Sequence, residues 1–175
     1  MSLPPPRPLE TERLSLTPLR QGDERWLWPV LSDARTMHFW AQPYGYDGVA
    51  RWIALAERTR ERLGISRFLL RRKADGRVVG DCGLFLLPVD DDPAARDFGW
   101  MVHWPFQGQG YAAEAARAVR DEAFGRYGLP SLTVNLNWQN HASRRVAEKL
   151  GARFLRRFHN ARHRWTPTEL YEVRP

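Results

Sequence analysis

The sequence predicts one domain of the α/β class, in an α+β layered arrangement of helices on a sheet. Short apolar or alternating segments, typical of strands, are interspersed with segments whose apolar residues recur at helical spacing. One strand-like segment, residues 97–104, runs through a glycine-rich loop directly into a helix-forming segment. The chain has 175 residues with no internal repeat or linker, which suits a single domain with a sizeable core.

The first part of the chain predicts a strand followed by two helices. Residues 11–19 alternate leucine with polar residues, as a half-buried strand does. Asp23 is suited to cap the next helix, in which Pro29 marks either a kink or the true start. A longer helix over residues 47–63 has an apolar stripe opposite a face rich in Arg and Glu, and Gly64 ends it.

Three strands are predicted next. Residues 65–72 and 77–87 flank an Ala-Asp-Gly turn of the kind that joins hairpins. Residues 97–104 contain Trp, Met, Val and other aromatic side chains that suit a packed strand, and Pro105 ends this strand because proline cannot donate to a ladder. The acidic run between them, Asp90 to Asp92, is either a solvated hairpin tip or a group of carboxylates near an amine substrate.

The last third predicts a helix, a strand, a second helix and a closing hairpin. Residues 111–124 are strong helix formers with little to break them. Residues 132–136 form a short apolar strand, and an asparagine-rich segment caps a helix over residues 142–150. The chain closes with a predicted hairpin formed by residues 153–158 and 165–173.

Charge indicates an anionic partner. The formal net charge is +7, and all but Lys73 and Lys149 of the 27 basic residues are arginines. These arginines are scattered along the chain, which favours a solvated basic surface over a nucleic-acid-binding tail. Such a surface would attract an anionic cofactor or an RNA-rich partner.

The composition of the sequence also indicates where in the cell the protein is expected. No run approaches the roughly 18 apolar residues of a membrane span, so no membrane contact is expected. Residues 1–10 lack the apolar core of a signal peptide and are expected to form a flexible proline-rich leader before a domain over residues 11–175. Cys82 is the one cysteine, so an internal disulfide is impossible. Histidines are dispersed, no metal site is expected, and a cytoplasmic location follows.

The loop after the strand 97–104 predicts an anion site. Gly108 and Gly110 allow a ligand to approach the backbone closely, and the helix that follows offers unpaired N–H groups. The spacing Gln107-x-x-Gly110-x-Ala112 is neither an ATPase phosphate loop nor a dinucleotide fingerprint. We expect it to hold a diphosphate. The alternative is an ordinary strand–loop–helix corner whose glycines only permit a turn.

Three separated motifs resemble one family. The glycine-loop spacing resembles the Gln/Arg-x-x-Gly-x-Gly/Ala signature of the GNAT (GCN5-related N-acetyltransferase) superfamily. Asn140-x-x-Ser143, with Val146 and Leu150-Gly151 after it, resembles a second segment of that superfamily, in the branch that acetylates alanine or serine N-termini of ribosomal proteins. Glu12-Arg13-Leu14 resembles the opening of that branch. In isolation, Asn140 would be a helix cap and Ser143 an exposed first-turn residue.

The resemblance implies the GNAT fold and acetyl-CoA as co-substrate. That fold has a mixed, largely antiparallel seven-stranded sheet, splayed between strands 4 and 5 and flanked by about four helices. A bulge near residues 101–103 would free backbone N–H groups for the pantetheine arm. The implied cofactor-binding residues are Met101, Val102, Gln107, Gly108, Gln109, Gly110, Tyr111, Ala112 and Asn140.

The implied chemistry is acetyl transfer to a primary amine by direct attack in a ternary complex. Ser143 would face the sulfur and assist departure of the thiolate. Asp97 is the first candidate for the base, since relatives often have a carboxylate on this strand, and His103 or a water is the alternative. Asp97 could equally be a strand-end carboxylate paired with an arginine.

The acceptor is expected to be a peptide or protein N-terminal α-amine or a small-molecule amine. Variable loops such as residues 39–48 are expected to build its pocket. Four aromatic residues, Trp40, Tyr44, Tyr46 and Trp52, either line this pocket or belong to the core. The partner could be a ribosome-associated protein, and the protein is expected to be a monomer or a homodimer. The alternatives are a non-catalytic acyl-CoA-binding module and a basic RNA- or ribosome-associated protein.

Overall fold

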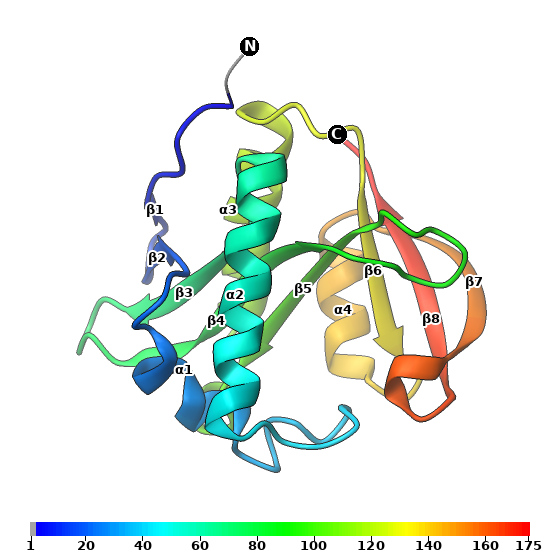
Figure 1. Cartoon of the computed structure of the whole chain (residues 1–175), viewed down its shortest axis with the longest axis horizontal. Coiled ribbons are helices and arrows are strands. Elements are labelled where there is room, and N and C mark those ends of the chain that lie inside the picture. Colours follow the sequence, from blue (N-terminus) through cyan, green and yellow to red (C-terminus); the bar gives the residue numbers. More distant parts are fainter. Residues whose placement is uncertain (1–2) are drawn as a thin grey trace.

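An eight-stranded sheet forms the frame of the protein (Figure 1), and the computed structural model describes residues 3–175. The strand order is β1-β2-β3-β4-β5-β6-β8-β7. The strands are β1 (Leu9–Glu10), β2 (Leu14–Pro18), β3 (Arg67–Arg72), β4 (Val78–Leu86), β5 (Arg96–Val102), β6 (Leu132–Asn137), β7 (Arg153–Asn160) and β8 (Thr166–Val173). The helices are α1 (Glu24–Leu31), α2 (Tyr46–Leu63), α3 (Tyr111–Gly125) and α4 (His141–Lys149), with 3₁₀ turns at Trp104–Phe106 and Ala161–His163.

The predicted class and sheet are confirmed. All seven predicted strands form, and every neighbouring pair but one is antiparallel. The exception is β5 with β6, which are parallel and share one Cα pairing, Asp97 with Thr133. Figure 1 shows the two strands diverging beyond it. The sheet is therefore splayed between the fourth and fifth predicted strands, as the resemblance implies.

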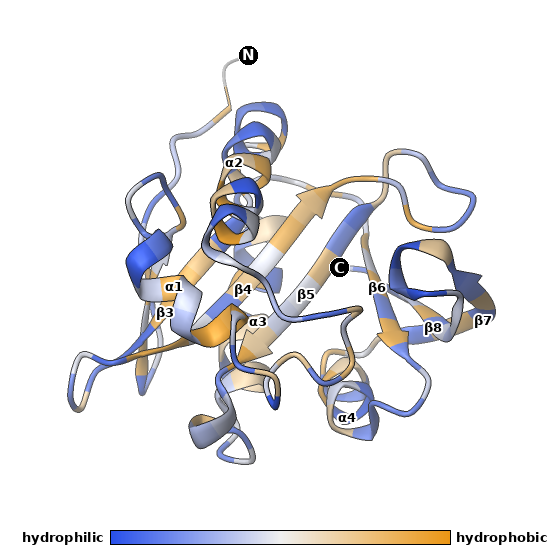
Figure 2. Cartoon of the chain, turned by 60° about the horizontal axis from the view of Figure 1, so that its bottom comes forward, coloured by the Kyte–Doolittle hydropathy of each residue, from blue (hydrophilic) through white to orange (hydrophobic). Residues whose placement is uncertain are grey.

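The helices cover the two faces of the sheet in pairs. Leu69, Phe85 and Met101 point to the face where α1 and α2 pack. Their neighbours along the strands, such as Phe68 and Phe98, point to the other face, where α3 packs. This alternation follows from the period of two in a strand. In Figure 2, apolar residues gather along β4, between the two helix layers.

The eighth strand comes from the predicted leader. Leu9 and Glu10 pair with Leu16 and Ser15 as β1, so the boundary expected after residue 10 is wrong by these two residues. Upstream of them, Arg7 donates from Nε and Nη2 to the Glu122 carboxylate of α3 at 2.9 and 2.7 Å. The segment before β2 is thereby attached to α3.

The bulge predicted near residues 101–103 is absent from the β4–β5 ladder. Pairing runs without a shift from Gly80 with Val102 to Leu86 with Arg96. The register shift lies one ladder away, where the β3–β4 pairing moves from Leu70 with Gly80 to Arg71 with Val78. Any backbone donors that β5 offers to a ligand must therefore come from the splay and not from a bulge.

Two smaller observations complete the fold. Pro29 lies inside α1, which begins at Glu24, so the proline does not mark the start of that helix. No helix within residues 3–175 is both long and apolar enough to cross a membrane.

Candidate functional site

A cavity of about 840 Å³ opens where β5 and β6 diverge. One end is lined by the loop before α3 and by the first turns of α3 and α4. The other end reaches the segment between α1 and α2, the middle of α2, and the 3₁₀ turn at Ala161–His163. The cavity therefore joins two parts of the protein with different chemistry, and the exposed edge of β5 lies between them.

The edge of β5 that faces the cavity carries free backbone donors. His103 donates its N–H to the Val79 carbonyl at 2.8 Å, which marks the odd-numbered residues of β5 as those bonded to β4. Trp100 and Val102 therefore direct their N–H groups toward β6, and the described β6 pairs with β5 only at Asp97. Of the two expected donors, Val102 lies on the cavity edge, whereas the N–H of Met101 points to β4.

The glycine loop has the conformation that its sequence suggested. Gly108 and Gly110 have φ angles of +74° and +85°, in the left-handed region that favours glycine, and Gly110 is the N-cap of α3. Gln107 Nε2 donates to the Val102 carbonyl at 2.8 Å and so attaches the loop to β5. Tyr111 and Ala112 in the first turn of α3 line the cavity.

Arg13 contacts both the glycine loop and the first turn of α3. Its Nη1 donates to the Gln109 carbonyl at 2.9 Å, and its Nε donates to Glu114 in the first turn of α3 at 2.7 Å. The guanidinium also lies over the Tyr111 ring, 4.6 Å from the centroid. These contacts give the Glu12-Arg13-Leu14 segment a structural role, because they fix the N-terminus of α3 beside the cavity.

The N-terminus of α4 lies on the same side of the cavity. Asn140 Oδ1 accepts the Ser143 N–H at 3.0 Å, which makes Asn140 the N-cap of the helix. Among the hydrogen bonds of the described residues, the Asn140 amide nitrogen donates none, so it remains available to a ligand. Ser143 and Lys149 also line the cavity. The two helix N-termini and the lysine make this end suitable for an anionic group.

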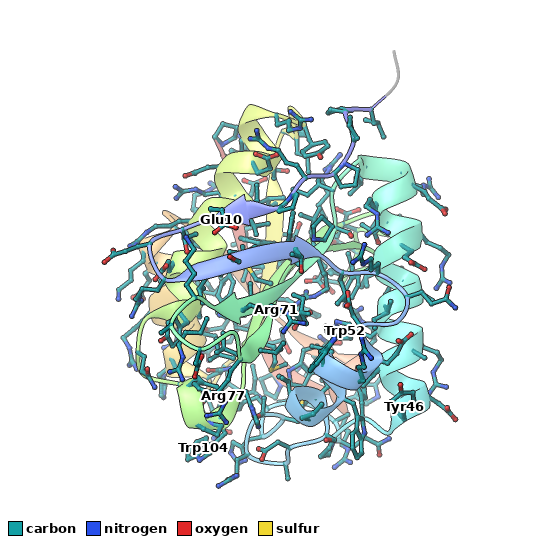
Figure 3. The ribbon with its side chains drawn as sticks, turned by 90° about the vertical axis from the view of Figure 1, so that its left-hand side faces the viewer. Glu10, Tyr46, Trp52, Arg71, Arg77 and Trp104 are labelled. Atoms are coloured by element: carbon teal, nitrogen blue, oxygen red, sulfur yellow. The ribbon has the colours of Figure 1, made fainter. Side chains whose placement is uncertain are left out.

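The other end of the cavity is aromatic. Trp52 lies at ring-centroid distances of 5.4 Å from Trp40, 5.7 Å from Tyr44 and 4.7 Å from Phe85. All four rings line the cavity. Tyr46 does not: it is 52% exposed and lies on the outer end of α2, away from Trp52 (Figure 3). Three of the four aromatic residues expected at the acceptor pocket are thus brought together there.

Asp97 is the carboxylate at this end. It accepts from Asn135 Nδ2 of β6 at 2.5 Å, and its Oδ2 is 3.8 Å from Arg162 Nη2. Burial raises the pKa of Asp97, and the charges of Arg162 and Arg67 with the Asn135 hydrogen bond offset only part of that rise. Asp97 is therefore a stronger base than an exposed aspartate.

The other acids and the histidine proposed from the sequence lie elsewhere. His103 lines a separate groove with Trp26 and Arg77, on the side that carries Arg71 and Arg77 in Figure 3. Asp90 accepts from Arg156 Nε at 3.0 Å and does not line the cavity, nor do Asp91 and Asp92. The hairpin-tip interpretation of that run therefore describes it best.

The sequence interpretation missed a buried polar group beside the aromatic rings. Asp81 of β4 is fully buried, and its Oδ2 accepts from Trp52 Nε1 at 2.9 Å and from Arg67 Nε. The Arg67 guanidinium lies over the Trp52 and Phe85 rings, 4.8 and 5.0 Å from their centroids. The available signal was an aspartate inside the otherwise uncharged β4 and an arginine at the start of β3.

His163 was missed as well. Its ring packs edge-to-face on Trp40 at 5.0 Å, it lines the cavity, and its buried Nδ1 has no hydrogen-bond partner among the described residues. Burial and the nearby charge of Arg162 lower the pKa of His163, so its imidazole is neutral at pH 7. No group of three His, Cys, Asp or Glu side chains within residues 3–175 is placed to hold a metal ion.

Residues 13–153 match the sequence model of a family described as "Acetyltransferase (GNAT) domain". The chain is also 27% identical over 169 residues to a Bacillus subtilis (strain 168) protein named "Uncharacterized protein YkkB". That similarity covers 94% of each of the two chains.

Solved structures share the fold. An acetyltransferase from Agrobacterium tumefaciens str. C58 superposes with a TM-score of 0.79 and 26% identity, over 100% of this chain and 96% of that one. RimL, a ribosomal L7/L12 α-N-protein acetyltransferase in complex with coenzyme A, superposes with a TM-score of 0.76 and 13% identity. The match covers 96% of this chain and 98% of RimL.

The environment of Asp97 predicts a pH-dependent stability change in Asp97→Asn. A carboxyl whose pKa is raised by folding destabilises the protein only where it is ionised. The cost is absent below the unfolded pKa of about 3.9 and complete above the folded pKa. Asparagine keeps the acceptor for Asn135 and removes the charge, so the variant should gain unfolding free energy relative to wild type as pH rises from 4 to 8.

Urea unfolding of both proteins across that pH range measures the difference. A variant that is less stable than wild type at pH 7, or a difference independent of pH, would contradict a folded-state pKa of Asp97 that is raised above its usual value.

Proposed function

The chain belongs to the GNAT acetyltransferases, and from that premise we propose that it transfers the acetyl group of acetyl-CoA to a primary amine bound beside Asp97. One observation carries the proposal. A single cavity joins the anion-binding end, at the N-termini of α3 and α4, to the aromatic end that contains Asp97. A donor and an acceptor bound at these two ends would meet at the edge of β5, as a ternary complex requires.

The residues at the first end fit coenzyme A. The loop from Gln107 to Ala112 offers backbone N–H groups and a helix N-terminus to the pyrophosphate. The N–H group of Val102 can bind a pantetheine amide as an added strand would, and the Asn140 amide can donate to the same arm. The N–H group of Trp100 then stays free for the thioester. In this arrangement Asn140 serves both as helix cap and as ligand contact.

The acceptor amine must lose a proton before it reacts. An α-amine titrates near 8 and a lysine side chain near 10.4, so deprotonation at neutral pH costs about 1 kcal/mol for the former and roughly 4–5 kcal/mol for the latter. Asp97 is the one carboxylate that lines the described cavity, and it has a raised pKa. A single base of modest strength matches an α-amine, which Asp97 can deprotonate directly or through a water.

The transfer itself forms one bond and breaks one. The amine lone pair attacks the thioester carbonyl carbon, and the Trp100 N–H, the free donor of this edge nearer to Asp97, donates to the oxygen on which charge develops. The carbon–sulfur bond then breaks as the carbonyl re-forms. The proton from the amine goes to Asp97, and the hydroxyl of Ser143 donates a proton to the departing thiolate and regains one from solvent.

A peptide with a free N-terminus and one internal lysine tests the function. We expect wild-type protein with acetyl-CoA to release the CoA thiol and to add one acetyl group, at the N-terminus, as located by fragment mass spectrometry. Tight binding of acetyl-CoA without turnover of any amine would instead indicate a non-catalytic binding module. Acetylation mainly at the lysine would overturn the choice of an α-amine.

Gly110→Val tests the anion site. The side chain enters a backbone position with φ +85°, where a Cβ meets Arg13 Nη2 at 3.3 Å and obstructs approach of a diphosphate. We expect acetyl-CoA affinity, measured by calorimetry, to fall by about tenfold or more, the loss of at least one hydrogen bond to a charged group.

Gly76→Val is the matched control for Gly110→Val. Gly76 has φ +70° in the β3–β4 turn with open space around it, so the substitution imposes similar backbone strain away from the cavity. Unchanged affinity in folded Gly110→Val protein, or an equal loss in the Gly76 control, would refute this role of the loop.

Ser143→Ala tests the proposed proton donor. General-acid assistance is worth about 10²–10⁴ in rate, and the low end is expected because a thiolate leaves readily. Turnover should therefore fall about a hundredfold while acetyl-CoA affinity stays near that of wild type. Single-turnover kinetics separate the chemical step from product release. A wild-type rate for that step would leave Ser143 as a first-turn residue of α4 only.

A further inference from the structure

The acceptor end of the cavity carries more positive than negative charge. Asp97 is its one carboxylate among the described lining residues, whereas Arg67 and Arg162 both line it. Arg35, from the segment between α1 and α2, also lines the cavity, but its guanidinium is paired with Asp33 at 3.1 Å. The partner of Arg67 is Asp81, which is fully buried beneath it and does not line the cavity. A ligand at this end therefore meets one carboxylate and two guanidinium groups, and this balance limits which amines can bind.

The position of Arg162 is fixed by a backbone hydrogen bond and not by an ion pair of its side chain. Its N–H donates to Asn160 Oδ1 at 3.0 Å within the 3₁₀ turn. The one carboxylate near its side chain is Asp97, at 3.8 Å, which is long for a hydrogen bond. By contrast, Arg144 and Arg157 both make 2.9 Å contacts with Glu169 outside the cavity. The Arg162 side chain is 44% exposed, and its guanidinium retains most of its donors for a ligand.

Arg67 also has donors that are weakly used. Its Nε is bonded to Asp81, but Nη1 and Nη2 reach the carbonyls of Gly83 and Gly99 at only 3.3 and 3.4 Å. Gly99 places no side chain over the guanidinium, and a Cβ there would lie 3.8 Å from Nη1. Each terminal nitrogen has a second N–H donor, and neither donor is required by Asp81, so both nitrogens retain donor capacity for a better acceptor in the cavity.

We infer that the acceptor carries a carboxylate within a few atoms of its reactive amine. The amine lies at Asp97, the carboxylate lies between Arg162 and Arg67, and an apolar side chain packs against the rings of Trp40 and Trp52. Guanidinium groups suit this partner because their forked donors match a carboxylate. This inference rests on the proposed function and names its substrate class.

Two kinds of molecule supply this chemistry. One is a free α-amino acid, whose own carboxylate is adjacent to the amine. The other is a peptide N-terminus with an acidic side chain at its second residue. Polyamines and other polycations are excluded by the same charges, because every further ammonium group would face Arg162 or Arg67 without a carboxylate of its own.

Matched acceptors test the inference through kcat/KM. The first pair is L-phenylalanine and L-phenylalaninamide, and the second is the dipeptide amides Phe-Glu and Phe-Gln; spermidine is added as a polycation. In one pair at least, the acid should exceed its neutral partner by about tenfold or more, the worth of a hydrogen bond to a charged group. The pair that responds identifies the source of the carboxylate.

The variant Arg162→Gln tests whether this arginine causes the preference for acceptors with a carboxylate. This variant should reduce the acid-to-neutral ratio to near 1, because any effect on Asp97 acts on both acceptors and cancels. Arg164→Gln is the control, since Arg164 is two residues along the chain and does not line the cavity. It should keep the wild-type ratio.

Three outcomes would overturn the inference, and they are distinguishable. Equal kcat/KM within both pairs, or a preference for spermidine, would show that the acceptor needs no carboxylate. The proposed acetyl transfer would not be affected by that result. A preference that persists in Arg162→Gln overturns the assignment to this arginine. Absence of turnover with every amine, under conditions where acetyl-CoA binds, overturns the proposed function and the inference with it.

Discussion

The site depends on one constraint: β5 and β6 are parallel neighbours that pair at a single position, Asp97 with Thr133. Each strand has a full ladder on its other edge, β5 with β4 and β6 with β8, so neither can move to close the gap. The N–H groups of Trp100 and Val102 consequently lack a strand partner. Unpaired backbone donors are costly unless a ligand or water satisfies them. The divergence thus creates both the cavity and the backbone donors that a ligand or water in it can satisfy.

The alternation of side chains along the strands divides the two faces of the sheet by chemistry. The face toward α3 is apolar, whereas the face toward α2 carries Arg67, Asp81 and Asp97 at positions of the same parity. Buried charges contribute little to stability and are costly if unpaired. Asp81 is compensated by Arg67 and Trp52, while Asp97 has one close hydrogen bond and a distant guanidinium. Asp97 is therefore the less compensated acid, and it is the one that lines the cavity.

Local patterns predicted the parts of this site that are continuous in sequence. The glycines before α3 and the asparagine cap of α4 could be read directly, because turn and cap chemistry is set by neighbouring residues. The contributions of Arg67, Arg162 and His163 could not, since each reaches the cavity through long-range pairing of strands. The position of His103 could not be predicted for the same reason: its chain neighbours do not reveal that it lies in the groove beside Trp26. The bulge was expected by resemblance, and the splay alone supplies the free donors in this chain.

The most direct test of this account is the response of backbone amides to acetyl-CoA, followed by NMR on labelled protein. The account predicts large shifts, and protection from solvent exchange, at the amides of Trp100, Val102, residues 108–113 and Ser143. Changes confined to the groove lined by Trp26 and Arg77, or no change along the β5 edge when acetyl-CoA saturates the protein, would contradict it.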